Sequence, residues 1–408
     1  MSNRWSRTET WVGLIVAAGG VLVMAIAGLF AFMTLTAKPL HPEPERVPSV
    51  AGSDPSQEWA GAVERGRQIM RTGLAEQNLP GLSVAVGAGG TLVWAEGFGW
   101  ANLENHERVT PATRFRIGTA SNALTSAAAG LLMEKEQLKL DEEIQRYVPE
   151  FPEKQSRVTL GQLMGHLAGV RTDGGDEGPL LAQHCEQPID AFPFFADRSL
   201  LFEPGTAYRY SSYGWIVVSA AIEAAAGKPF LAFMREQVFE PLQMDDTMAD
   251  SAEPLPDRAT PYFPRFGADP RYGLHPMRPI DYSCYAGASV FLSTPSDLVR
   301  FGLAINGGRL LQPPTVQLLQ TSQRLPSGEE TGYGLGWDLE TVTLAGEQTR
   351  AVGHDGDSLG GMVASLMTFR EPSLVVAVTA NISYADTAAL ALSIAQAFAE
   401  YGRSPALK

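Results

Sequence analysis

A long run without any charged side chain, Trp11–Ala37, constrains this chain more than any other feature. At about 1.5 Å of rise per residue, a helix over this run is long enough to cross a hydrocarbon core of roughly 30 Å. Trp5 and Trp11 stand where aromatic residues favour the membrane interface. The run therefore predicts one transmembrane helix at residues 11–37, preceded by a short cytoplasmic tail at residues 1–10.

The charges on either side of the run indicate how the helix would be oriented. Arg4 and Arg7 precede it, which favours a cytoplasmic amino terminus, although Lys38 follows on the other side. The alternative is a cleaved signal peptide, but its apolar region would be shorter, and Leu35 stands where a small residue would be needed. We expect an uncleaved signal anchor in the inner (plasma) membrane, with the rest of the chain facing the periplasm or exterior.

The segment that follows differs in composition from the rest of the chain. Residues 38–57 are rich in Pro, Ser and Glu and have few apolar side chains to bury, which predicts an extended linker. We expect one folded domain at residues 58–402. The hydrophobic content of the chain is 45%, an ordinary globular value, and no later shift in composition indicates a second domain.

Charge and cysteine usage narrow the classes of partner. The formal net charge is −14 and no run of Lys or Arg stands out, so a nucleic-acid backbone would be repelled. The six histidines show no metal-ligand spacing, so we expect no metal site. No cofactor is implied either. Cys185 and Cys284 lie in the exported region, where an oxidising compartment permits a disulfide, but the sequence does not give the distance between them. The oligomeric state is also left open.

Hydrophobic periodicity predicts strands at both ends of the domain and helices between them. The expected elements are a helix over Glu58–Asn78, a hairpin over 82–100 with a Gly-Gly turn, a buried helix over Ala120–Glu136, strands over 361–369 and 373–381, and a closing helix over Ala385–Tyr401. Strands from distant segments would then form one sheet, and the middle of the chain would form a helical lobe.

Several segments of the domain resemble, in order, the blocks of one known family. The stretch RFRIGTASNALTSAAAGLLMEKEQLKL, which begins at Arg114, is similar to the first catalytic segment of class C β-lactamases, DD-peptidases, related esterases and mitochondrial serine β-lactamase-like proteins. FEPGTAYRYSSYGW, GYGLGW and VGHDGDSLGGMVASLMTF follow in the family's order. The resemblance covers about Trp59 to Gly402. It implies an α+β fold of the β-lactamase/transpeptidase type, in which an antiparallel sheet flanked by helices meets an all-helical lobe at the active site.

The family works by acyl transfer, and the resemblance implies which residues would carry it. A serine at the start of a helix attacks a carbonyl, and a lysine one turn later helps to remove its proton. A tyrosine takes part in the proton transfers. A strand provides a Lys or His side chain and also the backbone N–H donors for the oxyanion. In this chain the serine and lysine positions are Thr119 and Asn122, whereas Tyr210 and His354 match the tyrosine and the strand residue. No lysine has a serine three residues before it, so no other register restores the motif.

The same resemblance implies four further residues that would contact a substrate. Ser212 stands where many members of the family have Asn. Gly353, Asp355 and Gly356 surround His354 in the His-x-Gly form of the third motif. A small molecule or a peptide is the expected ligand of such a cleft.

The altered first motif changes the chemistry to expect. Thr119 keeps a hydroxyl but adds a methyl group, and it could instead be the N-cap of its helix. Asn122 has no titratable amine, and the loss of a general base typically costs roughly 10²–10⁴-fold in rate. We therefore expect a serine-hydrolase-like protein for amides or esters whose activity is weak or lost, as in a pseudoenzyme. The alternatives are a non-catalytic module that binds a peptidoglycan peptide, a lipid or a protein partner, and a tethered scaffold whose cleft has no role.

Overall fold

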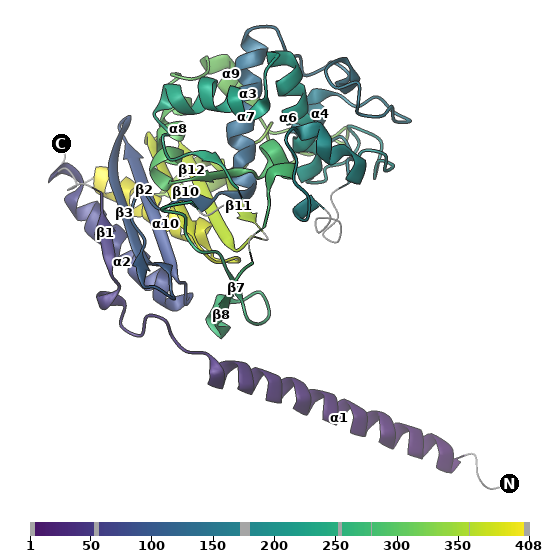
Figure 1. Cartoon of the computed structure of the whole chain (residues 1–408). Helices are drawn as coiled ribbons and strands as arrows, with labels where there is room; N and C mark the ends of the chain where they lie inside the picture. The colour runs from purple at the N-terminus through teal and green to yellow at the C-terminus, as the bar shows by residue number, and fades with distance from the viewer. Residues whose placement is uncertain are drawn as a thin grey trace.

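The structure, a computed structural model, describes residues 5–52, 57–171, 180–251, 255–278, 280–358 and 360–403. Its main sheet contains the strands β1 (Ser49–Ala51), β2 (Gly81–Ala88), β3 (Thr91–Asn102), β4 (Glu107–Arg108), β10 (Asp338–Leu344), β11 (Glu347–Ser358), β12 (Met362–Phe369) and β13 (Leu374–Ala380). They pair in the antiparallel order β1-β3-β2-β13-β12-β11-β10, with β4 beside β3. Because β2 and β13 are neighbours, the two ends of the domain meet in the middle of one sheet (Figure 1).

Alternate side chains of the central strands belong to two different cores. On β13, Val376 lies in a cluster with helices α2 (Ala60–Glu76) and α10 (Thr387–Gly402). Its neighbour Val375 lies in the other cluster, which includes helix α8 (Pro295–Asn306). This two-residue period is that of a strand covered on both faces, and every residue of β13 is buried.

A helical lobe forms the other half of the domain (Figure 1). Its helices are α3 (Ser121–Glu134), α4 (Leu160–Met164), α6 (Ser212–Ala226), α7 (Phe230–Met234) and α9 (Pro313–Leu319). Helix α6 is its central element, because it is buried from its first residue to Ile222. Its ends are well defined: the hydroxyl of Ser211 accepts a hydrogen bond from the amide of Gly214 at 3.1 Å, and Gly227 ends the helix with a left-handed φ of 64°.

The structure confirms the α+β fold and places most of the expected elements within a few residues. The expected hairpin is the pair β2 and β3, and its turn residues Gly89 and Gly90 have positive φ angles of 58° and 86°. Strand β10 was not expected, and β11, which carries part of the candidate site, was implied only by the family resemblance and not by hydrophobic periodicity. Two small sheets lie apart from the main sheet: β5 (Phe115–Arg116) with β6 (Met248–Ala249) and β9 (Phe291–Ser293), and a hairpin of β7 (Tyr262–Pro264) and β8 (Leu274–Pro276).

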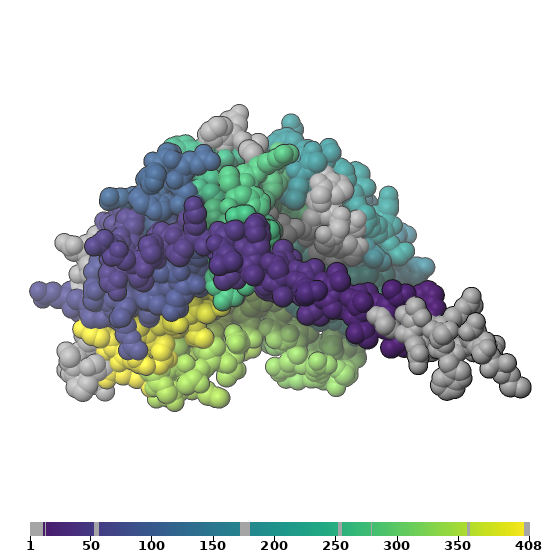
Figure 2. Space-filling view, turned by 90° about the horizontal axis from the view of Figure 1, so that it is seen from below, coloured from purple at the N-terminus to yellow at the C-terminus, as the bar shows by residue number. Residues whose placement is uncertain are grey.

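The amino-terminal apolar run forms one helix, α1 (Trp5–Thr36). Its part Leu14–Thr36, 23 residues long, is long and apolar enough to cross a membrane, as a signal sequence would also be. The helix includes residues 5–10 of the expected tail, and residues 1–4 lie outside the described part of the chain. Seen from below, the carboxyl-terminal end of α1 meets the domain beside the green segment of the β7–β8 hairpin (Figure 2).

The segment expected to be a free linker is instead largely part of the domain. The amide of Leu40 donates to Oδ1 of Asn78 at 2.7 Å, Val47 is buried, and β1 adds to the edge of β3. The prediction that the folded domain begins near Glu58 was therefore wrong for the described part of the linker; residues 53–56 lie outside it. Few apolar side chains are needed here, because backbone hydrogen bonds to an open sheet edge hold the segment.

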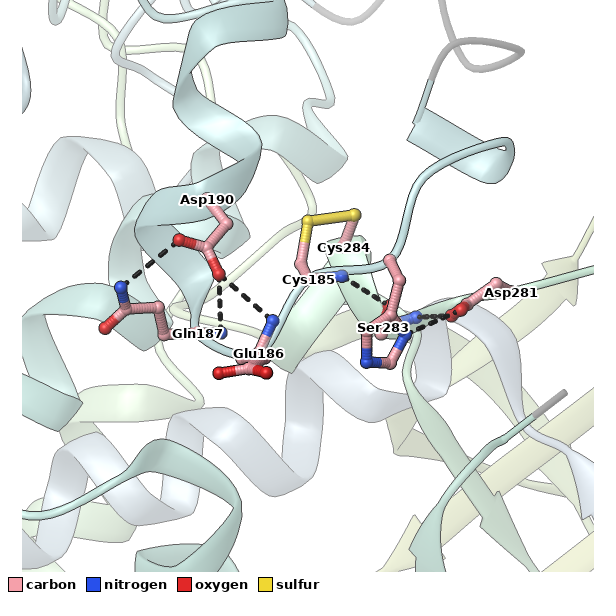
Figure 3. Close-up of a disulfide and its surroundings, with 8 residues drawn as sticks. Cys185, Glu186, Gln187, Asp190, Asp281, Ser283 and Cys284 are labelled. Atoms are coloured by element: carbon pink, nitrogen blue, oxygen red, sulfur yellow. Dashed lines mark hydrogen bonds and ion pairs between the residues drawn. A yellow bond between two sulfur atoms is a disulfide. The ribbon is translucent and has the colours of Figure 1, made fainter. Parts of the chain in front are cut away.

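Cys185 and Cys284 form a disulfide that joins segments 99 residues apart, with 4.8 Å between their Cα atoms (Figure 3). The amide of Cys185 donates to the hydroxyl of Ser283 at 2.9 Å. Nδ1 of His184 lies 2.8 Å from a carboxylate oxygen of Asp281. The bridge and these contacts fasten one loop of the helical lobe to the segment 283–288, which packs against α3 and α6.

Candidate active site

Thr119 lies in the turn that leads into α3. It belongs to the 3-10 turn Gly118–Ala120, where Gly118 adopts a left-handed φ of 53° that favours glycine. The Thr119 hydroxyl does not cap α3; it donates at 3.1 Å to the backbone carbonyl of Asp355 on β11. The N-cap role is therefore excluded, and the partly exposed hydroxyl lies between the helix and the strand.

Asn122 is one turn further along and is fully buried. Its Nδ2 donates to the hydroxyl of Tyr210 at 2.8 Å and lies 3.4 Å from Nε2 of His354. Its Oδ1 has no hydrogen-bond partner among the described residues. One uncharged amide thus connects the tyrosine of the helical lobe with the histidine of the sheet.

His354 is held in one tautomer by its neighbours. Its Nδ1 lies 2.7 Å from the carbonyl oxygen of Asp355, which can only accept, so Nδ1 carries the proton. Nε2 is then an acceptor, and it lies 3.0 Å from the hydroxyl of Tyr333 as well as close to the Asn122 amide. A carboxylate oxygen of Asp338 is 3.7 Å from Nδ1. The imidazole is therefore surrounded by protein groups, and only 3% of it is exposed.

Tyr210 reaches the site from the loop before α6, and His166 fixes this loop. Nδ1 of His166 accepts from the amide of Ser211 at 3.0 Å. The imidazole ring lies 4.1 Å from the ring of Tyr210 and 4.6 Å from that of Tyr333, measured between centroids. His166 is therefore a positioning residue, because it orients both phenols without touching Thr119 in the structure.

Strand β11 passes directly over the turn that carries Thr119. A Cβ atom on Gly356 would lie 1.9 Å from the carbonyl oxygen of Ile117 and 2.7 Å from the amide nitrogen of Ala120, so only glycine permits this approach. A Cβ atom on Gly353 would lie 1.8 Å from the carbonyl oxygen of Leu366 on β12. Gly356 is thus needed to bring strand and helix together, whereas Gly353 packs within the sheet.

The other two expected contact residues are placed differently. Asp355 contributes its backbone carbonyl, which accepts from both Thr119 and His354, and the residue is exposed. Ser212 is the buried first residue of α6, and no hydrogen bond among the described residues joins its side chain to Thr119 or Asn122. The structure therefore brings Thr119, Asn122 and the two ring residues together, and it places Ser212 at the start of α6, two residues after Tyr210.

The phenols of the site are difficult to ionise. Burial raises the pKa of Tyr210 well above its usual range, and hydrogen bonds with Thr119 and Asn122 offset this only in part. Burial also raises the pKa of Tyr208 to about 12. The carboxylate of Asp338 acts in the same direction on both phenols, because a nearby negative charge disfavours a second one. Both side chains therefore stay protonated at neutral pH.

Tyr333, Tyr208 and Asp338 belong to the site but were not predicted from the sequence. Tyr333 lies in GYGLGW, a block that marked the family without assigning a role to its tyrosine. Asp338 begins β10 and pairs with Gly353, a neighbour relation that follows only from the strand register. Within the described ranges, no group of three or more side chains is arranged to hold a metal ion.

Comparison with known proteins shows the family to which the chain belongs. The family model Beta-lactamase matches residues 67–399. The chain is 26% identical over 393 residues to the serine beta-lactamase-like protein LACTB, mitochondrial, of Homo sapiens, covering 74% of this chain and 71% of the relative. It is 25% identical over 285 residues to penicillin-binding protein 4* of Bacillus subtilis, covering 67% and 62%.

Solved structures share the fold at low sequence identity. An octameric penicillin-binding protein homologue from Pyrococcus abyssi superposes with a TM-score of 0.70 at 23% identity, over 81% of this chain and 76% of the other. The D-amino acid amidase of Ochrobactrum anthropi SV3, complexed with L-phenylalanine amide, gives 0.72 at 22% identity, over 84% and 99%. Given a family model that matches most of its length, the chain belongs to the beta-lactamase family.

Proposed function

We propose that this chain is a membrane-anchored, serine-hydrolase-like member of its family in which acyl transfer to Thr119 is weak or lost. The observation that carries the proposal is the hydrogen-bonded cluster at the start of α3. It keeps a hydroxyl, a phenol and an imidazole in one place, but an amide stands at its centre. The membrane part of the proposal is supported by the apolar helix α1.

The cluster could still carry a slow acyl transfer. The Thr119 oxygen would bond to the acyl carbon, and its proton would pass to the Tyr210 oxygen while the phenol gives its own proton to the leaving group. Negative charge still develops on the Tyr210 oxygen in such a relay, and burial disfavours this charge because it keeps the phenol protonated. Water would then attack the acyl carbon and regenerate the Thr119 hydroxyl.

The missing cation explains why this reaction should be slow. Asn122 can donate hydrogen bonds but cannot take a proton, and a neutral amide stabilises a developing phenolate much less than an ammonium group does. The carboxylate of Asp338 adds to this cost, because its negative charge also raises the pKa of Tyr210. The energetic cost of making a base therefore falls entirely on the buried phenol.

The carboxylates near His354 indicate the class of acyl donor. Asp338, Glu340 and Asp355 lie around a small hollow beside His354. They would repel a ligand that carries its own carboxylate, such as a penicillin, by the ordinary rule for like charges at close range. We therefore propose that uncharged or cationic esters and amides fit this cleft better than anionic ones.

A binding module that does not cut its ligand is the second candidate function. It is favoured by Oδ1 of Asn122, a buried acceptor with no partner among the described residues, which a ligand donor could satisfy. The ligand would be a peptidoglycan peptide, a lipid or a protein segment.

Mass spectrometry of the full chain in detergent micelles tests the proposal. The protein is incubated with a fluorescent penicillin and with uncharged activated esters, and acylation is located by peptide mapping. We expect a slow adduct on Thr119 with the uncharged esters, less with penicillin, and none in the Thr119→Ala variant. An adduct of equal yield in that variant refutes Thr119 as the nucleophile. A ligand-induced rise in melting temperature without any adduct supports the binding module.

A further inference from the structure

The connection between the apolar helix α1 and the domain is short. Thr36 ends the helix, and the amide of Leu40 is already bonded to Asn78 on the domain at 2.7 Å. Four residues span at most roughly 14 Å even when fully extended. If α1 crosses a membrane, the surface of the domain around Asn78 must therefore lie within reach of the lipid headgroups, which extend several ångströms beyond the hydrocarbon core.

Asn78 connects this attachment point to the hairpin of β7 and β8. Its side chain accepts from the amide of Leu40, and its Nδ2 lies 3.4 Å from the carbonyl oxygen of Pro270, in the 3-10 turn that joins the two strands. The ring of Phe266 in the same loop lies 6.3 Å from the ring of Phe32, near the end of α1. The hairpin is thus the part of the domain held next to the membrane end of the helix (Figures 1 and 2).

The hairpin also differs in charge from the rest of this acidic chain. Within residues 262–278 there are three arginines and one acidic residue, Asp269, whereas the whole chain has a net charge of −14. Asp269 pairs with Arg271, which leaves Arg265 and Arg278 without a carboxylate partner among the described residues. The guanidinium of Arg265 lies 5.0 Å from the centre of the Phe266 ring. Exposed arginines beside aromatic rings are the composition that binds anionic headgroups at a membrane interface.

We propose that the β7–β8 hairpin is a membrane-contact element, in which Arg265 and Arg278 bind anionic phospholipid headgroups and Phe266 lies at the interface. This rests on the proposed membrane anchor, since only a spanning α1 brings the hairpin to the bilayer. The contact would also fix the orientation of the candidate active site relative to the membrane. The amide of Tyr262 at the base of the hairpin donates to the carbonyl of Gly361, in the turn that follows the strand of His354.

A fluorescent label on the full chain, reconstituted in lipid nanodiscs, tests the contact. Both native cysteines are in the disulfide, so one introduced cysteine can be labelled with an environment-sensitive dye. Ala268→Cys places the dye on the exposed hairpin loop, and Leu318→Cys on the exposed face of α9 is the matched control. With nitroxide-bearing lipids in phosphatidylcholine–phosphatidylglycerol discs, we expect the dye at position 268 to lose most of its fluorescence and the dye at position 318 to keep it.

Charge variants separate lipid binding from simple proximity. The double reversal Arg265→Glu and Arg278→Glu should lower the quenching at position 268 to the level seen in discs of phosphatidylcholine alone. The control reversal at the exposed Arg309 and Arg370, which lie after α8 and β12, should not. Equal quenching at positions 268 and 318, or quenching insensitive to the Arg265 and Arg278 reversal, overturns the proposal. A chain that does not enter the discs refutes the anchor itself, which distinguishes the two failures.

Discussion

Replacing Asn122 by lysine, together with Thr119 by serine, should give the site the base that it lacks. The Asn122 amide is 2.8 Å from the Tyr210 hydroxyl, so an ammonium group near this position would act directly on the phenolate. At about 4 Å and an effective dielectric constant of about 20, two unit charges attract by about 4 kcal/mol. That energy corresponds to a fall of about 3 units in the pKa of Tyr210, since one unit is about 1.4 kcal/mol.

This shift sets the expected gain in rate. Each unit by which the pKa falls gives about tenfold more phenolate at neutral pH, so acylation of an activated ester should accelerate about 10³-fold, within the range of a typical general base. The pH dependence should change as well. In the natural chain the raised pKa of Tyr210 leaves the rate still rising at pH 10, whereas in the double variant the plateau should move toward neutral pH. Stopped-flow release of the ester's leaving group measures both.

Asn122 is fully buried, so the folding of each variant must be checked by near-ultraviolet circular dichroism and thermal unfolding. Asn122→Met is the matched control, because its side chain approaches the length of lysine without the charge. It should bind the ester but show no acceleration. A folded double variant whose rate rises less than about tenfold would refute the view that the missing cation limits this site.

Three further predictions concern stability. Burial lowers the pKa of His166 well below 6.5, so the unfolded state binds an extra proton at lower pH. The free energy of unfolding should therefore fall below pH 6.5 by up to about 1.4 kcal/mol per pH unit, and His166→Asn should flatten this slope in urea titrations. Serine replacement of both Cys185 and Cys284 should cost about 2–5 kcal/mol, seen as a lower melting temperature, because the bridge closes a long loop; an unchanged melting temperature would contradict a structural role. A soluble form beginning at Lys38 should be more stable than one beginning at Glu58 by about 2 kcal/mol or more. The shorter form loses strand β1 and the buried side chain of Val47 before it. Equal urea midpoints of the two forms would argue against this.

Much of the fold could be predicted because its elements have strong local signals. The β2–β3 hairpin is marked by a Gly-Gly turn between alternating strands, and α10 by a long apolar helix period. Strand β11 carries no such signal, because its central part is glycine and polar residues that pack against a turn. The prediction for residues 38–52 was wrong for another reason. This segment is held by pairing with an open edge of the sheet, and composition does not show that such an edge is available.

Only the site residues that lie at motif positions of the family were predicted from the sequence. Thr119, Asn122, Tyr210 and His354 were placed by family blocks, and the structure brings all four into one cluster. The tautomer of His354 could not be predicted, since it depends on a backbone carbonyl and on the hydroxyl of Tyr333. Tyr333 and other hydrogen-bond partners of the site come from segments distant in the chain. Only the folded structure shows which of these segments lie next to the site.

The few residues between Thr36 and Leu40 also determine where such a protein can work. Where α1 spans a bilayer, a domain with so short a connection diffuses laterally with the lipids. It then meets its partners by diffusion in two dimensions. The rate of meeting a partner then depends on surface density rather than on bulk concentration. Molecules that reside in or pass along the lipid surface are met often, whereas polymers some distance away must come to the domain.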